Sequence, residues 1–173
     1  AILGMGVYVG TVMIGLLVLL SLYLVLIFLF SRQHPASFMR DTRDVLLLAF
    51  STSSSAAVMP LSIKTAEEKL QVHPSVSQFV IPLGATINMN GTALYQGVAT
   101  VFLAQVFAVD LSTGALLLVI VTAVGASIGS PGTPGVGIVI LAMVLETVGI
   151  PVAGIVLIMG VDRILDMSRT AVN

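Results

Sequence analysis

The sequence predicts an all-α membrane protein whose transmembrane helices are interrupted by short polar stretches. Only 9% of the 173 residues are charged and 57% are hydrophobic, whereas a soluble globular domain carries about 25% charged residues. One apolar run is long enough to cross a bilayer. The later apolar runs all stop at Ser-rich, Asn-containing or Gly/Pro-rich sequences.

Composition excludes several classes of function. The net charge of −1 provides no basic surface for nucleic acid, and the absence of cysteine excludes disulfides and thiolate metal sites. His34 and His73 both precede a proline and are interpreted as solvated turn residues. Because no Ser/His/Asp or metal-ligand set converges, neither an enzyme nor a cofactor is expected.

Residues 5–30 carry no charge and predict a complete transmembrane helix, since a span needs about 20 apolar residues. A signal peptide is excluded because its apolar region has only about 7–15 residues and follows a basic segment. We expect the helix to end near Arg32, at the membrane interface, and a new element to begin at Pro35.

The remaining apolar runs are too short to cross a membrane alone, as is typical of re-entrant segments. Two hairpins are expected, with tips at 51–60 and 127–137. Each hairpin precedes a long helix that carries polar residues, at 88–92 and at 162–173. This order predicts a repeated unit, roughly 43–110 and 111–173, and such interrupted repeats mark the binding site of transporters.

Interrupted helices in a membrane imply an enclosed polar cavity, because an unpaired backbone group in hydrocarbon costs several kcal/mol. Helix N-termini offer N–H groups to anions, and unwound carbonyls offer oxygens to cations. Asn88, Asn90 and Gly91 predict such an unwound point. The alternative is that the two amides only form hydrogen bonds between helices.

The last segment supplies ionisable side chains on one face of a helix. Their spacing is that of a single stripe: Asp162, Asp166, Arg169, Thr170 and Asn173. Ionisable groups inside a membrane are expensive and usually functional. An arginine suits a carboxylate and an aspartate suits an ammonium group, so the stripe matches an acidic zwitterion. An ion pair that only holds helices together is the alternative.

Four stretches carry a resemblance to a known family: "TSSSAAVMP", "PLGATINMNGTALYQG", "ASIGSPGTPGVG" and "GVDRILDMSRTAVN". Their order and spacing resemble those of the dicarboxylate/amino acid:cation symporters, the glutamate/aspartate transporter family. The resemblance implies a partial, glutamate-transporter-like transport domain with two re-entrant helical hairpins, interrupted transmembrane helices and an inverted repeat.

The resemblance divides residues 1–173 into five parts: a transmembrane helix (5–30), a first re-entrant hairpin (37–70), a broken transmembrane helix (74–109), a second hairpin that acts as the gate (111–148) and a polar transmembrane helix (152–173). A scaffold domain would lie upstream, so we expect a fragment of a longer, homotrimeric protein. The family also carries a sodium-binding Asp just beyond Asn173.

Site residues follow from the same resemblance. Arg169 would hold the side-chain carboxylate of the substrate and Asp166 its amino group. The full set implied for the substrate is Ser53, Ser55, Thr92, Thr133, Gly137, Asp166, Arg169, Thr170 and Asn173. The set implied for sodium, largely through backbone oxygens, is Gly84, Thr86, Asn88, Asn90, Ser127, Ile128, Ser130 and Asn173.

The chain departs from the family pattern at two places. Asn90 stands where the family usually has an Asp that serves a third sodium, so we expect fewer coupled sodium ions. Many members also carry an arginine at the position of Ser53 or of Met167. Arg163, one turn before Met167, is either a substitute for it or an interfacial charge.

The function implied is a secondary active transporter that couples uptake of aspartate or glutamate to sodium by an elevator-type mechanism, with protons left open as a further coupling ion. A C4-dicarboxylate:cation symporter is the alternative; Asp166 disfavours it because a dicarboxylate has no ammonium group. An ion channel is a more remote alternative, since a filter needs symmetric carbonyl rings. The expected location is the plasma or inner membrane.

Overall fold

The computed structural model describes residues 2–173 and is helical throughout, without strands in that range. The elements are α1 (Ile2–Ser31), α2 (Pro35–Asp41), α3 (Arg43–Thr52), α4 (Ser55–Glu68), α5 (Pro74–Ile87), α6 (Asn90–Val106), α7 (Thr113–Ser127), α8 (Val136–Thr147), the short 3-10 helix η1 (Val152–Gly154) and α9 (Ile155–Val172). This agrees with the predicted all-α class.

Helix α1 is the one helix within residues 2–173 that is both long and apolar enough to cross a membrane. It runs uninterrupted over 30 residues. Most of its side chains are exposed, which suits a surface in contact with lipid. The residues that it buries, including Tyr8, Val12 and Leu16, face α6 and α9.

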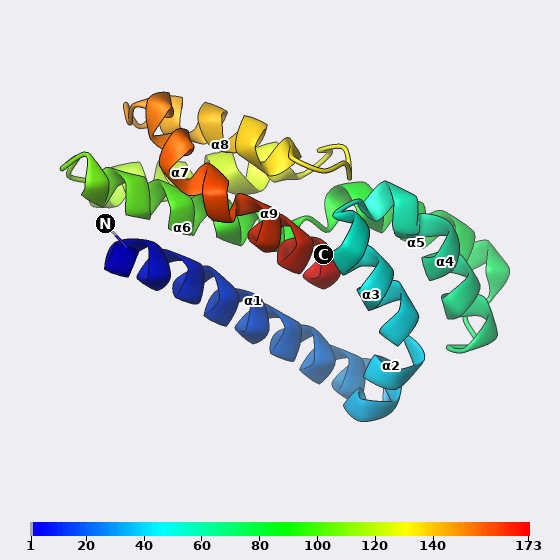
Figure 1. Ribbon diagram of the computed structural model, residues 1–173. Coiled ribbons are helices and arrows are strands. Elements are labelled where there is room, and N and C mark those ends of the chain that lie inside the picture. The colour runs from blue at the N-terminus through cyan, green and yellow to red at the C-terminus, as the bar shows by residue number, and fades with distance from the viewer. Residues whose placement is uncertain (1) are drawn as a thin grey trace.

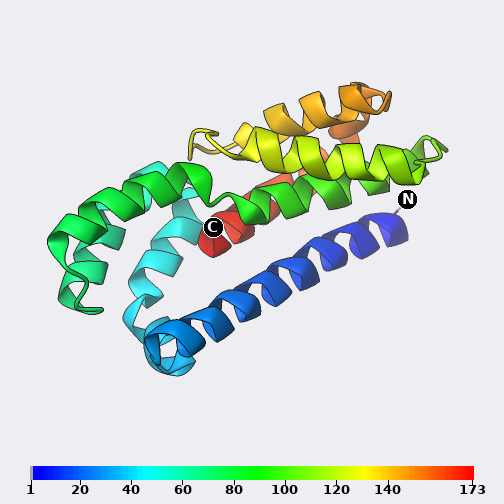
Figure 2. The same ribbon diagram turned by 180° about the vertical axis from the view of Figure 1, so that it is seen from behind.

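The other helices form two groups that meet in the middle of the molecule (Figure 1). At one end, α6, α7, α8 and α9 pack side by side, and α1 lies along α6 and α9. At the other end, α3, α4 and α5 pack in sequence, and α3 contacts α9. In the view from behind, α6 follows α5 after a short non-helical connection (Figure 2).

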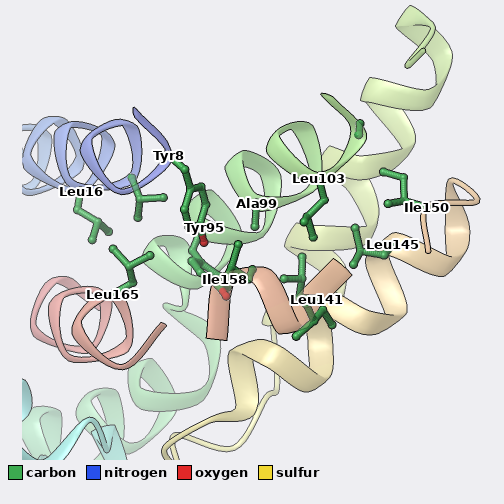
Figure 3. Packing of buried hydrophobic residues seen from close by; sticks show 13 residues of the cluster. Tyr8, Leu16, Tyr95, Ala99, Leu103, Leu141, Leu145, Ile150, Ile158 and Leu165 are labelled. Carbon is green, nitrogen blue, oxygen red and sulfur yellow. The ribbon is translucent and has the colours of Figure 1, made fainter. Parts of the chain in front are cut away.

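The main apolar core holds the α6–α9 group and α1 together (Figure 3). Its fully buried members come from four helices and include Tyr8, Leu103, Leu141, Ile158 and Leu165. A smaller cluster, which includes Val119 and Val144, joins α7 to α8. Because these clusters fix α6, α8 and α9 relative to one another, the polar ends of these helices are held in register.

An apolar cavity lies between α1 and the group formed by α3, α4 and α5. Its volume is about 510 Å³, and its lining comes mainly from α1 to α5 and the last turn of α9. Tyr23, Asn88 and Asn173 line it as well.

Two of the interruptions between helices contain fewer residues than the sequence predicts. The polar stretch 88–92 predicts an unwound segment, yet only Asn88 and Met89 lie outside α5 and α6. The remaining three residues form the first turn of α6 because a side chain from α9 caps that turn. At the first tip only Ser53 and Ser54 separate α3 from α4, and Ser53 adopts the left-handed conformation with φ of 53°.

Candidate functional site

Four segments at which helices end or are interrupted surround one small cavity in the middle of the molecule. The α3–α4 tip, the α5–α6 break, the α7–α8 tip and the last turns of α9 all contribute to its wall. All nine residues that the family resemblance assigns to the substrate line it: Ser53, Ser55, Thr92, Thr133, Gly137, Asp166, Arg169, Thr170 and Asn173. Its volume is about 20 Å³, enough for about one water molecule.

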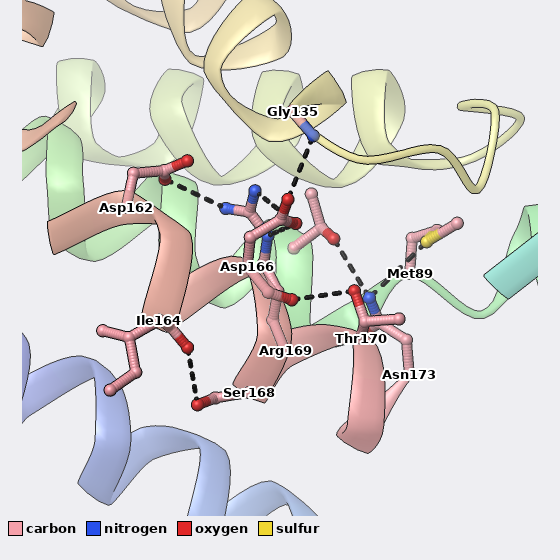
Figure 4. A network of polar contacts seen from close by, with 10 residues as sticks. Met89, Gly135, Asp162, Ile164, Asp166, Ser168, Arg169, Thr170 and Asn173 are labelled. Carbon is pink, nitrogen blue, oxygen red and sulfur yellow. Dashed lines mark hydrogen bonds and ion pairs between the residues drawn. The ribbon is translucent and has the colours of Figure 1, made fainter. Parts of the chain in front are cut away.

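Arg169 lies at the centre of this arrangement and is only 1% exposed (Figure 4). Its Nε and Nη2 donate to Asp166 Oδ1 at 3.1 and 2.9 Å. Its Nη1 lies 3.8 Å from Asp162 Oδ1, and its Cζ lies 4.1 Å from the centre of the Tyr95 ring. Two carboxylates and a cation–π contact therefore stabilise the buried guanidinium.

Asp166 connects α9 to the second tip. Its Oδ2 accepts a hydrogen bond from the Gly135 backbone N–H at 3.0 Å. Gly135 has φ of +80°, a conformation that L side chains rarely adopt, and this conformation directly precedes α8. The carboxylate thus binds the start of α8 and Arg169 at the same time, in agreement with the preference of helix N-termini for negative charge.

Gly137 allows α8 to approach the guanidinium closely. A Cβ atom at this position would overlap the Nη2, Cζ and Nη1 atoms of Arg169. Glycine is therefore required here by space rather than by backbone conformation, and it places the first turn of α8 directly against Arg169.

The start of α6 is capped by a residue 82 positions away in sequence. The first N–H groups of a helix have no intrahelical partner, and Met89 provides no side-chain cap. The Gly91 N–H instead donates to Asn173 Oδ1 at 2.7 Å, and Asn173 Nδ2 donates to Thr92 Oγ1 at 3.1 Å. The last turn of α9 is thereby tied to the α5–α6 break.

The two tips touch each other and cover the cavity. Ser54 Oγ donates to the Gly132 carbonyl at 2.8 Å, and the Ala56 N–H donates to the same oxygen at 3.1 Å. Ser54 also caps α4 by accepting from the Ala57 N–H at 3.2 Å. One serine therefore fixes both the helix start and the contact between tips.

The residues assigned to sodium fall into two clusters. Around Asn88, its N–H donates to the Gly84 carbonyl at 2.8 Å and its Nδ2 to the Asn173 carbonyl at 3.2 Å. Near the second tip, the Gly129 N–H donates to the Thr86 carbonyl at 2.8 Å, which brings the end of α5 next to residues 127–130. The assigned residues of this second cluster are Thr86, Ser127, Ile128 and Ser130.

Asn90 lies apart from the substrate cavity. Its Nδ2 donates to Asn88 Oδ1 at 2.8 Å and to Tyr23 Oη at 2.6 Å. The amide therefore faces α1 instead of the residues around Arg169.

Sequence reasoning missed several residues that touch this site. Tyr95 lies under the guanidinium, one turn after Thr92 on α6; the spacing of three would have placed both on one face. Ser54 and Gly132 form the contact between tips. Their place in the predicted tips was a signal, but nothing in the sequence pairs one tip with the other.

Two buried groups of the cavity wall are left without a hydrogen bond. Arg169 Nη1 and Ser53 Oγ have no hydrogen-bond partner among residues 2–173. More than about 90% of buried polar groups in proteins are hydrogen-bonded. These two atoms are therefore suited to a polar ligand or a water molecule.

Comparison with known proteins gives one consistent result. The whole chain, residues 1–173, matches the family described as the Sodium:dicarboxylate symporter family. The chain belongs to this family. It spans only about a third of the length of the curated relatives it matches, between 31% and 34% of each.

Three relatives of this symporter family illustrate the similarity. The protein glt-4 of Caenorhabditis elegans, whose name describes a sodium-dependent excitatory amino acid transporter, is 47% identical over 96% of this chain and 34% of its own length. Excitatory amino acid transporter 3 of Mus musculus is 44% identical over 98% and 32%, respectively. Excitatory amino acid transporter 1 of Ambystoma tigrinum is 44% identical over 98% and 31%.

Proposed function

We propose that the full-length protein is a secondary active transporter that couples uptake of an acidic amino acid, aspartate or glutamate, to sodium. The observation that carries this proposal is the buried Arg169 beside Asp166, in a closed cavity between two touching tips. The names of the relatives support both the amino acid and the sodium dependence.

Charge and shape favour an amino acid over a plain dicarboxylate. Arginine binds a carboxylate with two parallel hydrogen bonds, and Asp166 provides a partner for an ammonium group. Arg169 Nη1 and Ser53 Oγ, which have no hydrogen-bond partner among residues 2–173, offer further hydrogen bonds to carboxylate oxygens. A C4-dicarboxylate would leave Asp166 facing a second carboxylate, which is unfavourable.

A charge count explains why cations are needed. Asp162, Asp166 and Arg169, all at least 95% buried, carry a net charge of −1 when ionised. An acidic amino acid adds another −1, because its two carboxylates outweigh its ammonium group. Burying a net charge of −2 costs several kcal/mol per uncompensated ion, and sodium at the two backbone-oxygen clusters would compensate it.

Binding requires the site to open. The cavity is far too small for an amino acid, and Arg169 is occupied by Asp166. We propose that the 127–137 tip acts as the gate, that it separates from Ser54, and that the substrate carboxylate then takes over part of the guanidinium. An elevator-type movement, a homotrimer and a plasma-membrane location are further parts of this proposal.

A counterflow transport assay tests the proposal directly. Radiolabelled aspartate, glutamate and succinate are offered in counterflow to proteoliposomes of the full-length protein, with sodium or with choline in its place. We expect sodium-dependent exchange of aspartate or glutamate and little exchange of succinate. Exchange of succinate alone would favour the dicarboxylate alternative, and exchange without sodium would contradict the coupling.

The variant Arg169→Ala should abolish exchange of acidic amino acids, because it removes the only cation of the described residues that lines the cavity. Arg163→Ala is the matched control: it removes an arginine from the exposed face of the same helix and should retain most of the exchange. Unchanged aspartate exchange by Arg169→Ala would contradict the assignment.

A further inference from the structure

Helix α1 contributes one hydroxyl group to the α5–α6 break. Thr11, Ser21 and Ser31 donate their hydroxyl groups to carbonyls of α1 itself. Tyr23 differs, because its Oη donates to Asn88 Oδ1 at 3.1 Å and accepts from Asn90 Nδ2 at 2.6 Å. It reaches a part of the chain 65 to 67 positions away.

These three side chains form a closed triangle of hydrogen bonds. Asn90 Nδ2 completes it by donating to Asn88 Oδ1 at 2.8 Å. A phenol has one proton to donate and can also accept, so each contact of Tyr23 has a defined direction. Rotating the amide of Asn88 by 180° would place its N–H₂ group against the Asn90 N–H₂ group and its oxygen against the Asn173 carbonyl, so these contacts together determine which way this amide points.

The orientation of Asn88 is transmitted to the cavity. With Oδ1 held by the triangle, Asn88 Nδ2 donates to the Asn173 carbonyl at 3.2 Å. Asn173 then accepts from the Gly91 N–H at 2.7 Å and donates to Thr92 Oγ1 at 3.1 Å. A continuous chain of hydrogen bonds therefore runs from Tyr23 to Thr92 in the wall of the cavity.

We infer that Tyr23 is a positioning residue for sodium: its hydroxyl orients Asn88 and, through it, the Asn173 carbonyl that is assigned to the ion. This inference rests on the proposed function, since it assumes that sodium binds around Asn88. Without the hydroxyl, Asn88 loses one of the two donors that hold its Oδ1, and the Asn173 carbonyl loses its defined position.

The variant Tyr23→Phe keeps the aromatic ring and removes only the hydroxyl. In proteoliposomes of the full-length protein, we expect the sodium concentration for half-maximal aspartate uptake to rise about 3- to 10-fold, the range of one hydrogen bond. The maximal rate at saturating sodium should stay close to that of the wild type. If the hydroxyl had only a structural role, Tyr23→Phe would lower the maximal rate and leave the sodium concentration for half-maximal uptake unchanged.

A second measurement does not depend on transport. Sodium should raise the unfolding temperature of the purified full-length protein, and Tyr23→Phe should require about 3- to 10-fold more sodium for half of this effect. Ser21→Ala is the control: it removes a hydroxyl of the same helix that bonds only to the Leu17 carbonyl, and it should match the wild type in both assays.

The outcomes separate the two proposals. If the wild type depends on sodium and Tyr23→Phe has the same half-saturation or a lower one, the role of Tyr23 is wrong and the proposed function stands. If neither uptake nor unfolding of the wild type depends on sodium, the proposed function and the role of Tyr23 are both overturned.

Discussion

The guanidinium of Arg169 has little freedom at the scale of single residues. Two of its nitrogens donate to Asp166, and the Tyr95 ring lies 4.1 Å from its Cζ. On the side of α8, the backbone at Gly137 lies so close that even a Cβ atom there would overlap the guanidinium. This pairing is the alternative that the sequence left open, an internal ion pair. It is also compatible with binding, because a buried arginine must have a partner in the empty site.

We predict that Gly137→Ala lowers the apparent affinity for aspartate by about 10- to 100-fold, the equivalent of one charge-assisted hydrogen bond. The added methyl group would occupy the position of the guanidinium and force Arg169 away from Asp166. The concentration dependence of uptake measures this. Gly125→Ala, where an added Cβ meets nothing within 4 Å, should behave like the wild type, and equal affinities of both variants would contradict the prediction.

At the scale of helices, the break between α5 and α6 is stabilised from outside. The helix resumes at Asn90 because Asn173 of α9 satisfies the Gly91 N–H. Gly91 is needed for this approach, since a Cβ there would lie 2.9 Å from Asn173 Oδ1 and 3.2 Å from the Arg169 carbonyl. Helices α6 and α9 are therefore coupled at the edge of the cavity.

We predict that Asn173→Ala destabilises the full-length protein by about 1–3 kcal/mol, the cost of an unsatisfied buried donor. Thermal unfolding in detergent without substrate or sodium measures this effect apart from any role in binding. Ser168→Ala serves as the control, because Ser168 bonds only to the Ile164 carbonyl of its own helix. The prediction fails if both variants unfold at the temperature of the wild type.

At the scale of the whole molecule, the proposed function relates the net charge of the site to the number of sodium ions. The three buried ionised groups leave −1, and an acidic amino acid brings the total to −2. A neutral Asn90 adds nothing to this count, and its Nδ2 already donates to Tyr23 and Asn88. Two sodium ions would then balance the charge of these three groups and the substrate.

We predict that Asn90→Asp increases the number of coupled sodium ions by one. The new carboxylate adds a negative charge and replaces an N–H₂ donor with a second oxygen beside Asn88 Oδ1, an arrangement that favours a cation. The reversal potential of aspartate transport at several sodium gradients gives the stoichiometry. Asn90→Ser is the neutral control, and an unchanged stoichiometry in Asn90→Asp would argue against this charge count.

Much of the fold and the site could be predicted from local patterns. The apolar run at 5–30, the helix breaks and the stripe from Asp162 to Asn173 are periodic or compositional features, and each corresponds to an element of the structure. The residues assigned to the substrate by family resemblance all line one cavity. Their roles stay predictions, as do the five-part division, the re-entrant hairpins and the inverted repeat.

The sequence by itself determined which stretches form helices and near which residues they are interrupted, because those properties depend on neighbouring residues: apolar periodicity, Gly and Pro, and spacing on one helix face. Only the tertiary structure decided which distant groups meet. Asn173 caps α6, Ser54 contacts Gly132, Tyr95 lies against Arg169, and Tyr23 holds Asn88. These contacts depend on how the α1, α6, α8 and α9 core orients whole helices, and no local pattern encodes that orientation.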